Sequence, residues 1–171
     1  MSKFNEIKPE ELNKNTFKLI GKDWMLITAE KDNKVNTMTA AWGGFGVMFG
    51  KNVTYIVLRP QRYTKELVDN SSTFSLSFLD NSFKKQLNYL GTTSGRDEDK
   101  ISNSNLKIDY KNNTPYIKEA NLVIICKKLY AQNFNSECFI DNSLDKQWYP
   151  EKDYHTLYIS EIDKILIENN C

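Results

Sequence analysis

The sequence predicts a mostly β protein, an antiparallel β-barrel with short helices between its strands. Two segments, 73–79 and 154–168, alternate apolar and polar side chains with the period of two that is typical of strands. A third segment, 120–134, is long enough to bend between two walls of a barrel. The Gly-x-Gly-x-x-Gly signature and the Gly-Lys-Ser/Thr phosphate loop are both missing, so neither a Rossmann fold nor a P-loop is expected.

Length and composition indicate one globular domain over residues 1–171, because 171 residues with 40% hydrophobic side chains can bury a core. The net charge of +1 provides no overall field that would select nucleic acid or an anionic membrane. No apolar run approaches membrane-spanning length, and the N-terminus lacks a signal-peptide core. We therefore expect a cytoplasmic protein without nucleic-acid or membrane partners. One histidine and three scattered cysteines predict no metal site.

The first half of the chain predicts an arm, a hairpin, a strand and a helix. Residues 1–15 form a polar entry arm with one helical turn, and 24–30 form a strand that ends at a loop of about four residues, 31–34. The return strand begins near Val35. A third strand at 52–59 is almost continuously apolar and is expected to be buried on both faces. Pro60 ends it, and a helix follows from Arg62 to Asn70.

In the second half, the strand at 73–79 places Phe74, Leu76 and Phe78 on one face. A short helix over 83–90 is expected between a Ser82 cap and Gly91. Another helix is expected after a Ser94 cap, with Asp97 at the matching third position. Residues 102–118 predict an irregular crossing and 139–153 a loop. The long strand at 120–134 is expected to place Cys126 on one face with Leu122 and Ile124.

The stretch 36–46 combines small side chains, three glycines and Trp42 after a strand-like beginning. Small residues let a backbone approach another surface with its N–H and C=O groups exposed, which suits a flat heteroaromatic ligand. A tight corner of the barrel would need glycines equally, so this stretch alone does not establish a ligand.

Two further segments could hold an anion. Arg59, Arg62, Thr64 and Lys65 gather where a strand meets the N-terminus of a helix, which supplies guanidinium groups and free N–H groups for a phosphate. The alternative is that these arginines are solvated or pair with nearby acids. The segment 94–100 adds Gly95-Arg96, which a helix cap alone would not need, although Arg96 could instead pair with Asp97 or Asp99.

These segments, together with Asp153-Tyr154-His155, occur in an order and spacing that resemble the flavin reductase-like family, which includes the flavoredoxins and has the FMN-binding split-barrel fold. The resemblance runs from about Trp24 to about Ile162. It implies a homodimer with FMN near the subunit interface, and His155 near the flavin and nicotinamide. The implied FMN-binding residues are Asn36, Thr37, Met38, Thr39, Ala40, Ala41, Trp42, Arg59, Pro60, Gln61, Arg62, Tyr63, Thr64, Ser94, Gly95, Arg96 and Lys100.

Three positions depart from the family pattern. Ala41 stands where many members have serine, so only the backbone could contact the flavin there. Tyr63 stands where histidine is frequent, and Ser160 where glycine is frequent. The implied activity is transfer of a hydride or electrons from NAD(P)H through FMN to a flavin, iron or protein acceptor. The alternative is a flavoredoxin-type carrier that holds FMN tightly and oxidises little NAD(P)H itself.

Overall fold

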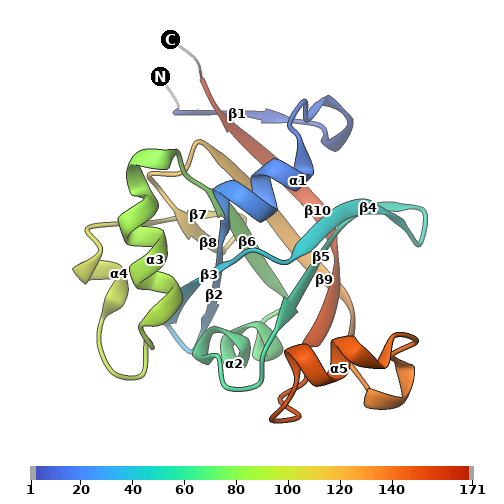
Figure 1. Cartoon of the computed structure of the whole chain (residues 1–171). Coiled ribbons are helices and arrows are strands. Elements are labelled where there is room, and N and C mark those ends of the chain that lie inside the picture. Colours follow the sequence, from blue (N-terminus) through green and yellow to red (C-terminus); the bar gives the residue numbers. More distant parts are fainter. Residues whose placement is uncertain (1–2, 170–171) are drawn as a thin grey trace.

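The computed structural model describes residues 3–169, and their fold is mostly β and antiparallel with short helices, as the sequence predicts (Figure 1). The strands are β1 (Phe4–Ile7), β2 (Met25–Lys31), β3 (Lys34–Ala40), β4 (Gly43–Met48), β5 (Lys51–Leu58), β6 (Thr73–Phe78), β7 (Ile108–Lys111), β8 (Thr114–Ile117), β9 (Leu122–Asn133) and β10 (Thr156–Glu168). The α-helices are α1 (Thr16–Lys18), α2 (Tyr63–Asn70), α3 (Lys84–Thr92), α4 (Lys100–Asn103) and α5 (Asn142–Trp148). Short 3₁₀ turns cover Pro9–Glu11, Asn81–Phe83 and Ser136–Cys138, and Leu19–Asp23 is π-helical.

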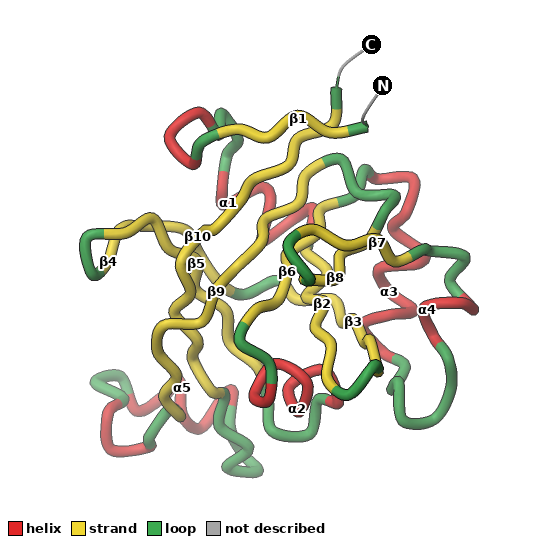
Figure 2. Tube along the Cα trace, turned by 180° about the vertical axis from the view of Figure 1, so that it is seen from behind, coloured by secondary structure: helices red, strands yellow, loops and turns green. Residues whose placement is uncertain are grey.

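One antiparallel sheet organises the molecule, in the order β3-β2-β6-β9-β10-β5-β4, with β1 also paired to β10. Residues 156–161 of β10 pair with β5, and residues 165–168 pair with β1. Its other edge pairs with β9, where register shifts at Ile159/Ser160 and Ile162/Lys164 bend both strands. The tube view shows β9 and β10 crossing the middle of the molecule and α2 at one end of the sheet (Figure 2).

Side chains from opposite faces of the sheet enter two different hydrophobic cores. On β9, the predicted face of Leu122, Ile124 and Cys126 enters the larger core with Phe74, Leu76 and Phe78 of β6. The alternate residues Val123 and Ile125 enter a second core beneath α3 and the β7–β8 hairpin. This burial on both faces explains why the first half of β9 is continuously apolar. Burial also raises the pKa of the Cys126 thiol to about 12.

The predicted strands are present, and the β2–β3 connection is tighter than predicted. Only Asp32 and Asn33 separate the strands, and both have positive φ, 50° and 60°. That conformation is typical of the two-residue turns whose twist matches paired strands, and asparagine and aspartate tolerate it. The expected four-residue loop was therefore too long.

Several local expectations were wrong. The crossing at 102–118 contains the β7–β8 hairpin, the loop at 139–153 contains α5, and residues 4–7 of the entry arm form β1. Asp80, not Ser82, caps the turn before α3, and that helix continues through Gly91 to Thr92. Asp99, not Ser94, caps α4. At both of these helix starts the N-cap residue is an aspartate, whose carboxylate accepts hydrogen bonds from backbone N–H groups.

The stretch 36–46 forms both a strand and a corner. β3 ends at Ala40, and the chain turns through Ala41 and Trp42 into β4, so the two edge strands of the sheet are consecutive in sequence. At this corner Gly43 has φ 152°, and an added Cβ would lie 2.3 Å from the backbone oxygen of Tyr55. Only glycine permits that approach. Within residues 3–169 no helix has the length and apolar character needed to cross a membrane.

Candidate functional site

A cavity of about 190 Å³ lies where the N-terminus of α2, the end of α3 and the loop before α4 meet. Its lining joins the two predicted anion-binding segments and the beginning of β3. The lining residues are Asn36, Gln61, Arg62, Tyr63, Thr64, Thr92, Thr93, Ser94, Gly95 and Lys100. All except Thr92 and Thr93 are among the residues that the sequence resemblance implies. These two threonines directly precede Ser94, and their hydroxyl groups are the sequence feature that could have identified them as site residues.

Two cations are held at this cavity by carbonyl groups. Arg62 donates to the carbonyl oxygen of Gly91 at 2.8 Å. Lys100 is only 2% exposed, and its Nζ donates to the carbonyl oxygens of Leu90 and Thr93, each at 2.9 Å. Burial and the nearby charge of Arg62 lower the pKa of Lys100 to about 8, and burial also lowers the pKa of Arg62. In the part of the chain that the structure describes, neither cation forms an ion pair with a carboxylate.

On the remaining wall of the cavity, the backbone at Gly95 lies against the side chain of Asn36. Asn36 of β3 donates from Nδ2 to Oγ1 of Thr64 at 2.8 Å, so the strand and α2 share a buried hydrogen bond. Gly95 packs directly on Asn36, and an added Cβ would lie 2.3 Å from its Oδ1 atom. The Oγ of Ser94 accepts the backbone N–H of Arg96 at 3.2 Å, which shapes the turn. Cations, hydroxyl groups and a glycine turn together suit a phosphate group.

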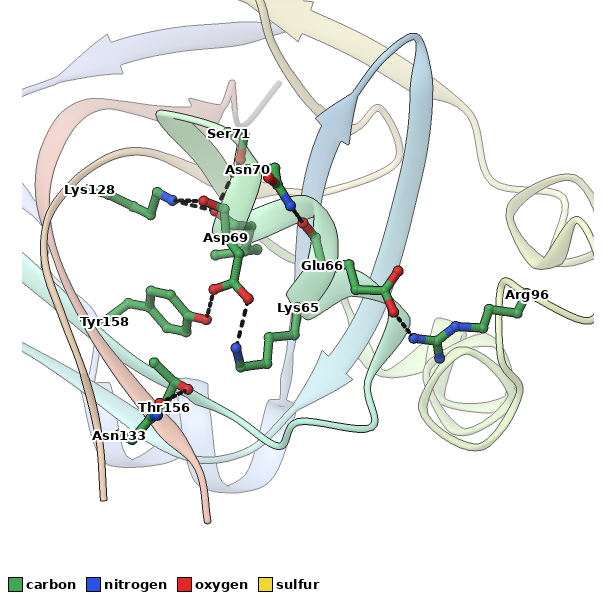
Figure 3. Close-up of polar contacts among 11 residues, drawn as sticks. Lys65, Glu66, Asp69, Asn70, Ser71, Arg96, Lys128, Asn133, Thr156 and Tyr158 are labelled. Carbon is green, nitrogen blue, oxygen red and sulfur yellow. Dashed lines mark hydrogen bonds and ion pairs between the residues drawn. The ribbon is translucent and has the colours of Figure 1, made fainter. Parts of the chain in front are cut away.

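The C-terminal end of α2 is fixed by polar contacts with β9 and β10 (Figure 3). Asp69 accepts hydrogen bonds from Lys65 at 2.7 Å and from the hydroxyl of Tyr158 on β10. Lys128 of β9 donates to the carbonyl oxygens of Val68 at 2.5 Å and Asp69 at 2.9 Å, a favourable place for a cation on a helix. These contacts hold α2 on the sheet, and so fix the position of the cavity at its other end.

Arg96 lies outside the cavity lining. Its guanidinium pairs with Glu66 of α2 (Figure 3). It also donates to the carbonyl oxygen of Gln61 at 3.1 Å and lies 5.1 Å from the ring centre of Tyr63. The predicted alternative of an acid partner is correct in kind, but the partner is Glu66 rather than Asp97 or Asp99. Arg96 therefore clamps the loop before α4 against α2.

Arg59 points away from Arg62 although only two residues separate them. Arg59 pairs with Asp153 and donates to the carbonyl oxygen of Trp148 at 2.7 Å. The side chain of Gln61 also donates to Asp153, at 2.9 Å. Arg59 follows β5 whereas Arg62 precedes α2, and the turn at Pro60 sends their side chains to different surroundings. In this structure the two arginines contact different groups of the protein, and their predicted convergence on one ligand group stays a prediction.

Trp42 and His155 meet in a second cluster beside Arg59. Their ring centres lie 5.2 Å apart with planes tilted by 31°, and Trp148 of α5 packs edge-on against Trp42 at 4.9 Å. Trp42 is 39% exposed, and Trp148 41%. Sequence reasoning missed Trp148 and Tyr149 as site residues because they lay in an expected loop. The aromatic pair just before Asp153-Tyr154-His155 was the available signal.

Residues 37–42 differ in how much they can contact a ligand. Thr37 and Met38 are buried, and Oγ1 of Thr37 bonds to Oγ1 of Thr28 at 2.9 Å. Thr39 donates to the carbonyl oxygen of Leu87 on α3 at 2.5 Å. The chain emerges at Thr39, so Thr39, Ala40 and Ala41 are partly exposed, and Trp42 is exposed.

Residues 17–170 match the flavin reductase like domain family. The chain belongs to this family. A search of curated proteins found no match. Solved structures confirm the fold at low sequence identity. They include an FMN-binding domain of a flavin reductases-like enzyme from Shewanella baltica, with 16% identity and a TM-score of 0.71 over 96% of this chain and 77% of that chain.

Two flavoredoxins also share the fold of this flavin reductase-like chain. The protein from Methanosarcina acetivorans has 21% identity and a TM-score of 0.70, over 95% of this chain and 77% of the other. The flavoredoxin of Desulfovibrio vulgaris has 20% identity and a TM-score of 0.69, over 96% and 79%. This chain is thus similar both to a flavin reductases-like enzyme and to flavoredoxins, so the likeness establishes the split-barrel fold and does not distinguish between activities.

Proposed function

We propose that this chain binds FMN and transfers reducing equivalents through it. The observation that carries the proposal is the pair of half-buried Arg62 and buried Lys100, two cations without a carboxylate partner among residues 3–169, at a cavity lined with hydroxyl groups. A phosphomonoester would offset their repulsion and accept their remaining hydrogen bonds. Gly95 lets the turn pack closely on Asn36 at the cavity wall, and Thr64 and Ser94 would offer hydroxyl groups to the phosphate.

The isoalloxazine ring would lie along the partly exposed backbone of Ala40 and Ala41, with Trp42 as a wall. When bound, FMN supplies the redox chemistry, because its ring accepts a hydride or single electrons. The protein contributes position and charge. His155 beside Trp42 would contact the flavin or nicotinamide edge, and unchanged reduction kinetics in His155→Ala would remove it from the mechanism.

Binding is tested by titrating the purified chain with FMN and with riboflavin, which lacks the phosphate. We expect the unmodified chain to bind FMN much more tightly than riboflavin. Lys100→Met should weaken the binding of FMN by about tenfold to a hundredfold, the effect of removing one charged hydrogen-bond donor, and should leave the binding of riboflavin unchanged. Lys107→Met, at an exposed position, is the matched control. Equal affinities for FMN and riboflavin in the unmodified chain would refute the phosphate assignment.

We favour an NAD(P)H-dependent flavin reductase that passes electrons to a flavin, iron or protein acceptor. The partly exposed cluster of Trp42, Trp148 and His155 supports it, because it offers a second planar group a place beside the flavin. The second candidate is an electron carrier, favoured by the structural likeness to flavoredoxins. Anaerobic addition of NADH or NADPH to the FMN-loaded protein separates them. Rapid bleaching supports the reductase, whereas bleaching only by dithionite or a reduced redox protein supports the carrier.

We also propose that two copies assemble as a homodimer. The tip of the β4–β5 hairpin exposes three large apolar side chains on one projecting segment, at Val47, Met48 and Phe49 (Figure 1). A second copy would cover them. Light scattering after size exclusion should give about 40 kDa, twice the 19.9 kDa of one chain. We expect Phe49→Lys to shift the mass toward that of a monomer.

A further inference from the structure

Among residues 3–169, the imidazole ring of His155 has one hydrogen-bonding partner, and that partner is a buried tyrosine. The hydroxyl of Tyr149 lies 2.7 Å from Nδ1 of the imidazole, and the two residues are 2% and 8% exposed. The rings of Phe134 and Phe139 pack edge-on or tilted around Tyr149 at 6.4 Å and 5.7 Å. These contacts therefore fix the orientation of the Tyr149 and His155 rings.

The direction of this hydrogen bond follows from the acceptors present. Among the described residues, the Tyr149 hydroxyl has no acceptor other than Nδ1 of His155. If the imidazole donated from Nδ1, the buried phenol O–H would lack an acceptor, which proteins avoid. Burial raises the pKa of Tyr149, so the phenol keeps its proton. The backbone N–H of His155 is a hydrogen-bond donor to the phenol oxygen and therefore cannot accept that proton. The phenol must then donate to Nδ1.

The charged groups around His155 are consistent with a neutral ring. Arg59 lies 5.3 Å from the ring centre of Tyr149, and its charge opposes protonation of the imidazole. Asp153 acts in the opposite direction and is itself paired with Arg59. Burial has the largest effect, and together these groups lower the pKa of His155 to about 4. At neutral pH the ring therefore carries one proton.

We propose that Tyr149 is a positioning residue that holds His155 in the tautomer protonated at Nε2. The imidazole then presents a hydrogen-bond donor to the ligand beside Trp42 and does not serve as a base. A donor of this kind matches a carbonyl oxygen, such as those of an isoalloxazine or a carboxamide. The role toward a ligand rests on the proposed flavin function, whereas the tautomer itself does not.

The tautomer is measurable directly, because His155 is the only histidine in the chain. A long-range ¹H–¹⁵N spectrum of the unliganded protein at pH 7 should show a proton on Nε2 and an unprotonated Nδ1. Tyr149→Phe should shift the ring toward a mixture of tautomers. Tyr154→Phe, which removes a hydroxyl bonded to Asp145, is the control and should leave the ring unchanged. A proton on Nδ1 in the unmodified protein, or an unaltered spectrum in Tyr149→Phe, overturns the proposal.

Kinetics of the FMN-loaded protein test the donor role separately. His155→Gln keeps an N–H donor near the position of Nε2 and should reduce flavin within about threefold of the unmodified rate. His155→Ala should lose about tenfold, the worth of one hydrogen bond. If Gln is as slow as Ala, the donor role is wrong. If FMN does not bind at all, the proposed function fails, and the spectrum still decides the tautomer.

Discussion

Lys100 should take up a proton when a phosphate group enters the cavity. In the unliganded protein, burial and Arg62 lower the pKa of Lys100 to about 8. A dianionic phosphate beside it would favour the charged form and return the pKa toward its ordinary value near 10.5. Phosphate monoesters are already dianionic at pH 8, and arginine stays protonated, so Lys100 dominates the exchange.

The magnitude follows from the two pKa values. At pH 8 Lys100 is about half protonated before binding and almost fully protonated afterwards, so binding should take up about 0.5 proton. At pH 6.5 the uptake at Lys100 should be close to zero. The same shift predicts that FMN affinity falls about tenfold between pH 7 and pH 9, because binding at pH 9 must first protonate Lys100.

Titration calorimetry at pH 8 in Tris and in HEPES measures the uptake, since the two buffers release different heats when they donate a proton. Lys100→Arg keeps the positive charge and should bind FMN without uptake. Tight binding of FMN by the unmodified chain with no proton uptake at pH 8 would refute the placement of the phosphate beside Lys100.

The same lowered pKa has a consequence for folding without ligand. Between pH 8 and about 10.5 the unfolded chain binds more protons at Lys100 than the folded chain does, so stability should rise with pH in that window. Below pH 8 the buried charge costs about 3 kcal/mol, from 1.36 kcal/mol per pKa unit. Urea unfolding at pH 8 and pH 10 should show this rise in the unmodified chain and lose it in Lys100→Met. A flat profile in the unmodified chain would contradict the burial of a charged Lys100.

Three further substitutions test other parts of the structure. Gly95→Ala places a methyl group 2.3 Å from Oδ1 of Asn36, and FMN affinity should fall at least tenfold in a fluorescence titration; unchanged affinity would contradict the close contact. Asp69→Asn weakens the contacts that hold α2, including the one from Tyr158, and should cost about 1–3 kcal/mol in urea unfolding; unchanged stability would show that these contacts do not hold the helix. Trp42→Phe should alter the fluorescence of bound flavin, and an unaltered spectrum would place Trp42 away from the ring.

The sequence predicts the central strands well, because two cores impose strong patterns on them. β6 alternates and β9 is apolar on both faces, and each pattern has a simple geometric cause. The hairpin of β7 and β8 has only four residues per strand and contains Pro115, so its pattern is too short to recognise. α5 is mostly polar and begins at an Asp141 cap. Both features are also common in loops, so the sequence pattern does not distinguish this helix from a loop.

The lining of the cavity beside α2 was predicted better than the aromatic cluster around Trp42. Arg62, Thr64, Gly95 and Lys100 converge because helix ends and glycine turns constrain the backbone locally. The partner of Arg59 lies 94 residues away in sequence, and only the folded chain brings the two together. Local motifs identify which groups are available, whereas long-range pairing decides which of them face a ligand.

The strand β10 lies in the middle of the sheet and follows every one of its partners, β1, β5 and β9, along the chain. The sheet therefore cannot be completed before residues 156–168 are available for pairing. Until then, β1, β5 and β9 expose unpaired strand edges. Such long-range closure predicts slow folding and a period of vulnerability to aggregation during synthesis. His155 stands immediately before this strand, so completing the sheet and placing the imidazole are one event.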